Sequence, residues 1–322
     1  MRMPHVLVAG RIHDSGLDFL QAVPDFTFDL IEEITLAGYE PHIHKADALL
    51  LRTQPLQADT IEKAIRLKIV SRHGVGYDAV DVAALSARNI TLAIVGDVNS
   101  RAVAEHTLML MLSAARKTVA HDAAVRTGNW NVRNSFSTVE LDGKKLFLIG
   151  FGRIGKNVAK LAQAFGMRVF AYDPYVSADA MTELGVAFVP EIADGISGAD
   201  FVSLHIPAMG GSAVIGAAEL AQMKSCAILI NAARGGLIDE LALDAALRNG
   251  EVAAAAIDVF VDEPPSASHP LLCNSKVVVS PHSAGLTQEC AARMSVAAVQ
   301  NIINYFNGTL DAKQVVNAAQ LG

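Results

Sequence analysis

The chain has 322 residues, of which 52% are hydrophobic and 18% charged, and its formal net charge is −7. A chain of this length suggests about two domains, and its apolar content argues against disorder because it can fill a sizeable core. The negative charge argues against nucleic acid as a main partner, since phosphate binding needs a basic surface.

The sequence has no sign of export or of a membrane span. Its most apolar stretch, residues 107–115, falls short of the roughly 18 apolar residues that a span requires. The first residues lead directly into a strand-like segment and have no apolar signal-peptide region. The three widely spaced cysteines, Cys226, Cys273 and Cys290, match neither a disulfide framework nor a Cys-x-x-Cys metal site. We therefore expect a cytoplasmic protein without a metal site.

Short apolar, β-branched runs alternate with Ala-rich amphipathic segments, which predicts repeated βα units and mostly parallel sheets. Helices are expected between the first strands, for example at Ile61–Arg66 and Val80–Arg88, and Asp14 is the expected N-cap of a helix at Leu17–Gln21. The first expected strands are Val6–Gly10, Phe26–Ile31, Ala48–Arg52, Lys68–Arg72 and Ile90–Val95.

The longest helical pattern covers Arg101–Arg126 and suggests a helix that links two domains. A second α/β series follows it, and a last helix is expected at about Leu286–Phe306. Six or seven parallel strands are typical of a doubly wound dinucleotide-binding domain. The strands of this series are expected at Leu146–Gly150, Arg168–Asp173, Ala187–Val189, Phe201–Ile206, Ala227–Ala232, Ala254–Phe260 and Lys276–Pro281.

The second series opens with the pattern G-x-G-x-x-G at residues 150–155. Alone this signal is weak, because glycines are common in turns. Here a buried strand precedes the pattern, the amphipathic segment Lys156–Gly166 follows it, and the next strand ends on Asp173, 18 residues after Gly155. The combination predicts a dinucleotide-binding βαβ unit. The alternative is a plain glycine turn followed by an ordinary aspartate.

Each residue of this pattern has a physical task. Gly150 permits a tight turn, Gly152 lets the backbone approach a pyrophosphate, and Gly155 lets helix and strand pack closely. The helix N-terminus offers unpaired N–H groups to the phosphates. Asp173 can accept hydrogen bonds from the adenosine ribose and would repel an added 2′-phosphate. We therefore predict NAD as the cofactor.

Three later segments, residues 230–240, 257–264 and 280–285, place polar residues just beyond buried strands. Ligands bind at such positions in open α/β sheets. In the first segment, Arg234 can hold a carboxylate bidentately, and the neighbouring Gly235 and Gly236 leave room for a ligand. In the other two segments, His282 can transfer protons near neutrality, and Glu263 precedes a proline. A structural histidine and a solvated Glu-Pro turn are the alternatives, which these residues alone leave open.

Taken together, these motifs resemble the D-isomer-specific 2-hydroxyacid dehydrogenase family, which includes phosphoglycerate, glycerate and D-lactate dehydrogenases. The resemblance also covers Arg72–Asp78, Ala104–His106, Tyr172–Pro174 and Leu204–Pro207. It implies an α/β fold of two doubly wound parallel-sheet domains. It also implies that a Rossmann NAD-binding domain, residues 100–286, is inserted into a flavodoxin-like substrate-binding domain made of residues 1–99 and 287–322. It further implies a homodimer, with the helix at 101–126 in the subunit contact.

The resemblance also assigns residues to roles. Arg234 would grip the carboxylate of the substrate, His282 would be the general acid/base, and Glu263 would pair with His282. Substrate binding would also involve Arg52, for a second anionic group, and the backbone amides of Val75 and Gly76. Cofactor binding would involve Gly150, Gly152, Arg153, Ile154, Gly155, Asp173, His205, Pro207, Ala232, Ala233, Asp258, His282 and Gly285, with Asp258 beside the nicotinamide carboxamide.

The implied reaction is the NAD-dependent interconversion of a small 2-oxo acid and its D-2-hydroxy acid. Formate and phosphite dehydrogenases share this architecture, but that branch typically has Gln where this chain has Glu263. A second alternative is an NAD-binding corepressor or redox sensor, which the intact set of Arg234, Glu263 and His282 disfavours. Residues 208–213 depart from the Thr-rich family pattern, so contacts of this loop with the cofactor are left open.

Overall fold

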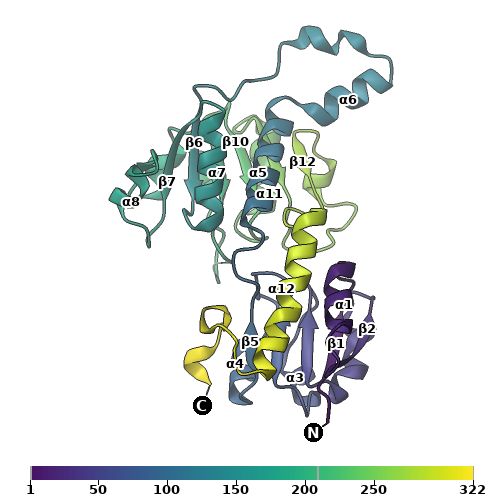
Figure 1. Ribbon diagram of the computed structural model, residues 1–322. Helices are drawn as coiled ribbons and strands as arrows, with labels where there is room; N and C mark the ends of the chain where they lie inside the picture. Colours follow the sequence, from purple (N-terminus) through teal and green to yellow (C-terminus); the bar gives the residue numbers. More distant parts are fainter. Residues whose placement is uncertain (1, 209, 322) are drawn as a thin grey trace. The chain divides into compact units, whose positions relative to one another are not determined.

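The computed structural model describes residues 2–208 and 210–321, which form two compact units (Figure 1). Unit 1 consists of Met1–Asn99 and Leu286–Gly322, and unit 2 is the continuous segment Ser100–Gly285 between them. The division differs by one residue, Leu286, from the predicted domain limits. The binding roles assigned to the two domains stay predictions. Among the described residues, no helix combines the length and apolar character needed to cross a membrane.

Unit 1 is built on a five-stranded, all-parallel sheet with the strand order β2-β1-β3-β4-β5. This is the order of flavodoxin-like sheets, so the predicted fold class of this part is confirmed. The inner strands are apolar on both faces, as parallel strands covered by helices on both sides must be. The strands are β1 His5–Ala9, β2 Thr27–Ile31, β3 Ala48–Leu51, β4 Ile69–Arg72 and β5 Thr91–Ala93.

The last long helix of the chain belongs to unit 1, where it packs on β3, β4 and α1. A Cβ atom on Gly16 would lie 2.6 Å from Cβ of Ser295, so only glycine allows α1 to approach α12 this closely. The helical elements of unit 1 are α1 Asp14–Gln21, α2 Leu36–Tyr39, η1 Glu40–Lys45, α3 Ala58–Lys63, α4 Val82–Ala87, α12 Gln288–Phe306, η4 Ala312–Gln314 and η5 Ala318–Gln320.

Unit 2 has a seven-stranded, all-parallel sheet with the order β12-β11-β10-β9-β6-β7-β8. The chain starts in the middle of the sheet, winds to one edge, and then returns to extend the other. This is the Rossmann arrangement with one added strand, which confirms the predicted fold class. The strands are β6 Lys145–Ile149, β7 Arg168–Tyr172, β8 Ala187–Phe188, β9 Phe201–Leu204, β10 Ile228–Asn231, β11 Ala254–Ile257 and β12 Val277–Val279.

Helices cover the sheet of unit 2, and α5 packs against α7 and on β10 and β11 (Figure 1). Most of α5 is buried, including Leu108, Leu110 and Met111. The helical elements of unit 2 are α5 Ser100–Ala115, α6 Thr118–Arg126, η2 Trp130–Ser135, α7 Arg153–Ala164, α8 Ala178–Thr182, α9 Ile192–Ile196, α10 Ala217–Leu220, α11 Glu240–Asn249 and η3 Pro270–Cys273.

Three predicted helical features were wrong. The single helix at 101–126 is two helices, because Lys117 has φ +51° and breaks the helix where its buried residues end. The N-cap of α1 is His13, whose ring accepts the Ser15 N–H, while Asp14 is already helical. Helix α3 begins at Ala58 and ends at Lys63, because Ala64 leaves the helical region.

All twelve strands lie where they were predicted, but most end one to three residues earlier. The residues beyond the true strand ends include Gly10, Arg52, Gly150 and Asp173. These positions form loops at the carboxyl ends of the two sheets, which is where ligands bind in folds of this type.

Candidate active site

One edge of the sheet in unit 2 collects most of the predicted site residues. The glycine loop follows β6, Arg234 follows β10, Glu263 lies beyond β11 and His282 lies beyond β12. Because all seven strands are parallel, their carboxyl ends share one edge, and these residues are therefore brought to one side of the sheet.

The glycine loop has the geometry of a dinucleotide site. Gly150 has φ +101°, and a Cβ atom there would lie 2.5 Å from the carbonyl oxygen of His205. A Cβ atom on Gly155 would lie 2.4 Å from the oxygen of Gly150. By contrast, a Cβ atom on Gly152 would have no atom of the other described residues within 4 Å, its two chain neighbours left aside. Gly152 thus leaves open space, while the other two glycines are required by the packing of the loop itself.

Helix α7 begins directly after this open position. Its N-cap is Gly152, and no described side chain caps the helix with a hydrogen bond. The N–H groups of Arg153, Ile154 and Gly155, in the first turn of α7, have no carbonyl partner within the helix. A helix N-terminus of this kind binds phosphate through its N–H groups and its positive dipole end. These residues fit a dinucleotide pyrophosphate.

Asp173 ties the glycine loop to the end of β7. Its Oδ2 accepts a hydrogen bond from the N–H of Phe151 at 2.8 Å, and its Oδ1 accepts one from the N–H of Tyr175 at 2.8 Å. Each carboxylate oxygen has a further lone pair, so both can also accept from ribose hydroxyls. Ribose binding by Asp173 stays a prediction.

His205 lies beside the glycine loop, just beyond β9. Its Nε2 is 2.9 Å from Oγ of Ser203, and its Nδ1 is buried without a hydrogen-bond partner among the described residues. Burial lowers the pKa of His205 to about 4, so the ring is neutral at pH 7. Pro207 follows in an exposed loop. In the unusual stretch 208–213, Met209 lies outside the described residues.

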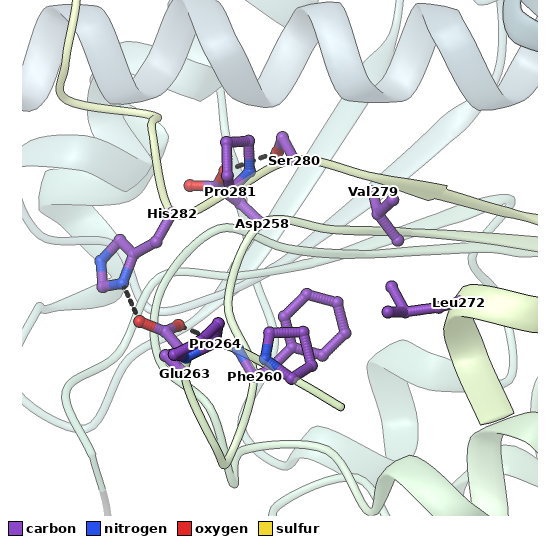
Figure 2. Close-up of a pocket in the computed structure, with 10 residues that line it drawn as sticks. Asp258, Phe260, Glu263, Pro264, Leu272, Val279, Ser280, Pro281 and His282 are labelled. Atoms are coloured by element: carbon purple, nitrogen blue, oxygen red, sulfur yellow. Dashed lines mark hydrogen bonds and ion pairs between the residues drawn. The ribbon is translucent and has the colours of Figure 1, made fainter. Parts of the chain in front are cut away.

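His282 and Glu263 form a hydrogen-bonded pair, which Figure 2 shows with the imidazole turned toward the carboxylate. His282 Nδ1 lies 2.6 Å from Glu263 Oε2. An ionised carboxylate only accepts, so Nδ1 carries the proton and Nε2 is left to exchange a proton with a ligand. The side chains are 45% and 36% exposed, respectively, so a substrate can reach the pair.

The environment of Glu263 keeps it charged. Burial alone would raise the pKa of Glu263, but hydrogen bonds from His282 and from the N–H of Phe260, together with the charge of His282, bring this pKa below its usual value. The Phe260 N–H lies 3.0 Å from Glu263 Oε1. Glu263 therefore presents a fixed carboxylate to the imidazole.

Asp258 organises the turn that carries His282. Its carboxylate accepts hydrogen bonds from the hydroxyl of Ser280 and from the N–H groups of Ser283 and Ala284, while its carbonyl accepts from the N–H of His282 at 2.7 Å. The Asp258 residue is 0% exposed. In this conformation it offers no surface to a nicotinamide carboxamide, so that predicted contact stays a prediction that needs the turn to move.

The Arg234 loop is held by its own side chains. The amide of Asn231 donates to the carbonyl of Arg234 at 2.8 Å and accepts from the N–H of Ala233. The expectation that Gly235 leaves room for a ligand is wrong, because a Cβ atom there would lie 1.9 Å from the carbonyl oxygen of Phe260. Gly235 instead lets the loop after β10 pack against the backbone of the loop after β11. This packing fixes the backbone position next to Arg234.

An apolar pocket of about 400 Å³ opens beside the pair of His282 and Glu263. Figure 2 shows Phe260, Pro264, Leu272 and Val279 around it, with His282 at its border. The pocket and the pair are formed by the same loops after β11 and β12, so the imidazole is bordered by apolar surface on this side.

The remaining predicted residues belong to unit 1 and follow β3 and β4. Arg52 donates a hydrogen bond to the carbonyl of Arg11 at 2.7 Å, and burial lowers its pKa. Val75 and Gly76 lie in the loop after β4, preceded by Gly74 with φ +152°. Their roles in substrate binding stay predictions.

Several side chains without a predicted role contact the loops that carry Glu263 and His282. His106 on α5 lies 3.0 Å from Ser280 Oγ and 3.4 Å from Asp258 Oδ1. Glu240 accepts from the N–H of Val261 at 2.9 Å and lies 3.0 Å from Nε2 of His269, which anchors the loop of Glu263. The sequence signals for His106 were its place in an apolar helical pattern and in the Ala104–His106 motif of the family resemblance.

Comparison with known proteins gives a consistent assignment. Residues 108–284 match the family model described as "D-isomer specific 2-hydroxyacid dehydrogenase, NAD binding domain", in agreement with the predicted cofactor NAD. The chain is 38% identical over 317 residues to D-3-phosphoglycerate dehydrogenase of Methanocaldococcus jannaschii, covering 98% of this chain and 60% of the relative. It is 42% identical over 305 residues to the enzyme of the same name from Mycobacterium leprae, covering 94% and 57%.

A solved structure is similar over nearly its whole length. It is a D-lactate dehydrogenase from Aquifex aeolicus complexed with NAD and lactic acid, with a TM-score of 0.87, 25% identity, and 97% of this chain and 98% of the other covered. The chain spans about 60% of the length of the curated relatives named above. From the family model and these relatives, the chain belongs to the D-isomer specific 2-hydroxyacid dehydrogenase family.

Proposed function

We propose that this protein interconverts a small 2-oxo acid and its D-2-hydroxy acid with NAD. The observation that carries the proposal is the pair of His282 and Glu263, 2.6 Å apart, on the same sheet edge as a glycine loop that fits a dinucleotide. A proton donor that titrates near neutrality, held beside a nucleotide site, is what reduction of a carbonyl requires.

The bound cofactor supplies the hydride for reduction and takes it up in oxidation. In reduction, C2 of the 2-oxo acid gains the hydride, and the electron pair of the C=O bond moves to oxygen. His282 Nε2 gives its proton to that oxygen, which yields the hydroxyl group. Glu263 holds the ring through Nδ1 and stabilises the protonated form before transfer. In oxidation, His282 takes the proton back.

Binding of the substrate is assigned to residues of both units. We propose that Arg234 holds the carboxylate and the carbonyl oxygen, since a guanidinium binds a carboxylate with two parallel hydrogen bonds. From unit 1 we propose the N–H groups of Val75 and Gly76 for the carboxylate, and Arg52 for a second anionic group. The relatives named D-3-phosphoglycerate dehydrogenase support an acid that carries such a group.

The test is turnover by the purified chain, followed through NADH absorbance. Glyoxylate, pyruvate and hydroxypyruvate would be offered with NADH, and D-3-phosphoglycerate and D-lactate with NAD⁺, each repeated with the NADP(H) form. We expect turnover of at least one acid and a preference for the NAD form. Absence of turnover with every acid, while NADH still binds, would favour the corepressor or sensor alternative.

The same assay separates the formate branch. Oxidation of formate releases CO₂ and needs no proton acceptor, whereas the fixed Glu263–His282 pair is suited to moving a proton. We expect no turnover of formate with NAD⁺. Formate turnover that survives the substitution His282→Ala would contradict the assignment of this pair.

We also propose that the protein is a homodimer, with the contact moved from the predicted helix to α6 and the segment after it. Helix α5 is buried within unit 2, whereas α6 has no buried residue and projects from the unit (Figure 1). Helix α6 and the segment up to Phe136 form an arm, residues 118–136. Large apolar side chains are exposed along this arm, with Phe136 89%, Trp130 66% and Val119 62% exposed. Such clusters of apolar side chains mark interaction surfaces.

The oligomeric state can be measured by sedimentation equilibrium at several concentrations. We expect a dimer for the natural chain and a monomer for the double variant Trp130→Ser, Phe136→Ser. The matched control Tyr175→Ser, at a residue 94% exposed outside this arm, should remain dimeric. A monomeric natural chain would contradict the proposal.

We further propose that the protein is located in the cytoplasm, a reducing compartment. Cys226, Cys273 and Cys290 are all free thiols. Unpaired cysteines persist in the cytoplasm, where thiols are kept reduced. Cell fractionation with a thiol-reactive probe would check this location.

A further inference from the structure

His106 lies on α5, yet its ring contacts the ends of two strands. Nε2 of His106 is 3.0 Å from Oγ of Ser280 and 3.4 Å from Oδ1 of Asp258, and the side chain is 15% exposed. The hydroxyl of Ser280 donates its only proton to Asp258 Oδ1. Oγ must therefore accept from His106, so Nε2 of His106 carries a proton that it shares between Ser280 and Asp258.

Asp258 transmits this contact to the turn of His282. Its carboxylate accepts the N–H groups of Ser283 and Ala284, each at 3.0 Å, and its carbonyl accepts the N–H of His282. His282 has φ +50°, a conformation that a residue with a Cβ atom adopts only when its surroundings impose it. The hydrogen bonds of Asp258 involve this residue and the two that follow it.

We propose that His106 is a positioning residue for the reaction: its Nε2 proton fixes the buried Asp258 carboxylate, which in turn holds the 280–284 turn so that the imidazole of His282 meets Glu263. This inference rests on the proposed function, because it assigns His106 a part in the placement of the proton donor. It gives Asp258 an internal task, in agreement with its complete burial.

The charge state of Asp258 agrees with this arrangement. Burial alone would raise the pKa of Asp258, but hydrogen bonds from His106, Ser280 and the two backbone amides bring it below its usual value. A buried carboxylate stays ionised only where donors surround it. Removal of His106 takes away the N–H group that Asp258 Oδ1 and Ser280 Oγ share. The hydroxyl oxygen of Ser280 then loses this donor.

The test compares His106→Leu, which removes the donor, with His106→Gln, whose amide N–H₂ can donate from a similar position. The matched control is His44→Leu, because His44 is an exposed histidine whose ring nitrogen Nδ1 lies 3.0 Å from the carbonyl oxygen of Pro41, away from the strand ends of unit 2. We expect kcat to fall by about tenfold to hundredfold in His106→Leu, the range for loss of one hydrogen bond to a charged group. KM and Kd for NADH should stay within about twofold of the wild type, and His106→Gln should recover most of kcat.

A second readout does not depend on turnover. Amide hydrogen exchange at Ser283 and Ala284 should become at least about tenfold faster in His106→Leu and should not change in His44→Leu. Unchanged exchange and unchanged kcat would overturn the inference. Faster exchange in a chain that turns over no acid would refute the proposed function while the positioning role of His106 stands.

Coupling between residues provides the last check. Ser280→Ala keeps His106 but removes the hydroxyl that lies between His106 and Asp258. If His106→Leu fails to fold, Ser280→Ala tests the same connection by its loss of kcat. The losses of kcat in His106→Leu and Ser280→Ala should not add in the double variant, because both break one connection. Fully additive losses would show that the two residues act separately, and the inference would be wrong.

Discussion

The buried histidine of unit 1 makes the stability of that unit sensitive to acid. His73 follows β4, is 6% exposed, and lies with Nε2 2.9 Å from Oγ of Ser295. Burial, together with the charges of Arg52 and Arg72, lowers the pKa of His73 to about 4. The folded chain therefore holds a neutral ring at pH values where the ring in the unfolded chain, with a pKa of about 6.5, is already protonated.

The sign and size of the effect follow from this difference. Below pH 6.5 the unfolded chain takes up a proton that the folded chain refuses until about pH 4, so stability is lost as the pH falls through this window. A pKa lowered from about 6.5 to about 4 corresponds to about 3 kcal/mol in full. Most of this, about 2 to 3 kcal/mol, is lost between pH 7.5 and 4.5.

The perturbation is His73→Gln, which keeps a hydrogen-bonding side chain next to Ser295 but does not titrate. Urea unfolding at pH 7.5 and 4.5, read through amide exchange of the β4 residues, gives the unfolding free energy of unit 1 at each pH. We expect the loss on acidification to be about 2 to 3 kcal/mol smaller in the variant than in the wild type. The control His44→Gln should leave it unchanged, and an equal loss in wild type and His73→Gln would refute the reasoning.

Predictions for three further variants concern unit 2. Gly152→Ala should fold normally but bind NADH at least about tenfold more weakly, measured by fluorescence titration, because its Cβ atom would meet no described protein atom but would occupy the space that we predict for the phosphates. Gly155→Ala should instead lower Tm by several degrees, since its Cβ atom would lie 2.4 Å from the oxygen of Gly150; equal behaviour of the two variants would contradict this account of the loop. Glu263→Gln should lower kcat by roughly tenfold to a hundredfold with little change in Tm, because the amide still fills the space but no longer stabilises the protonated ring. An unchanged kcat in steady-state assays would contradict the role of that carboxylate.

Much of the fold could be read from the sequence because its signals are local. Apolar runs such as Leu146–Gly150 identify buried parallel strands without further knowledge, and the glycine pattern is confined to six residues. The break at Lys117 could not be foreseen, because the apolar pattern continues weakly into α6 while the packing partner within unit 2 ends with α5.

The site was only partly predictable, for a related reason. Residues at strand ends, such as His282, follow from the topology of parallel sheets. The contact of His106 with Ser280 joins residues 174 positions apart, and no spacing rule links them. Gly235 shows the same limit, since its need for glycine comes from the backbone of Phe260, which belongs to another strand end.

The substitution His282→Ala tests the central claim most directly. With whichever 2-oxo acid the wild type reduces, kcat should fall by roughly 10²–10⁴, the usual contribution of a general acid, while the Kd for NADH is unchanged. Full turnover by a correctly folded His282→Ala variant would contradict the claim that this imidazole, held by Glu263, supplies the proton.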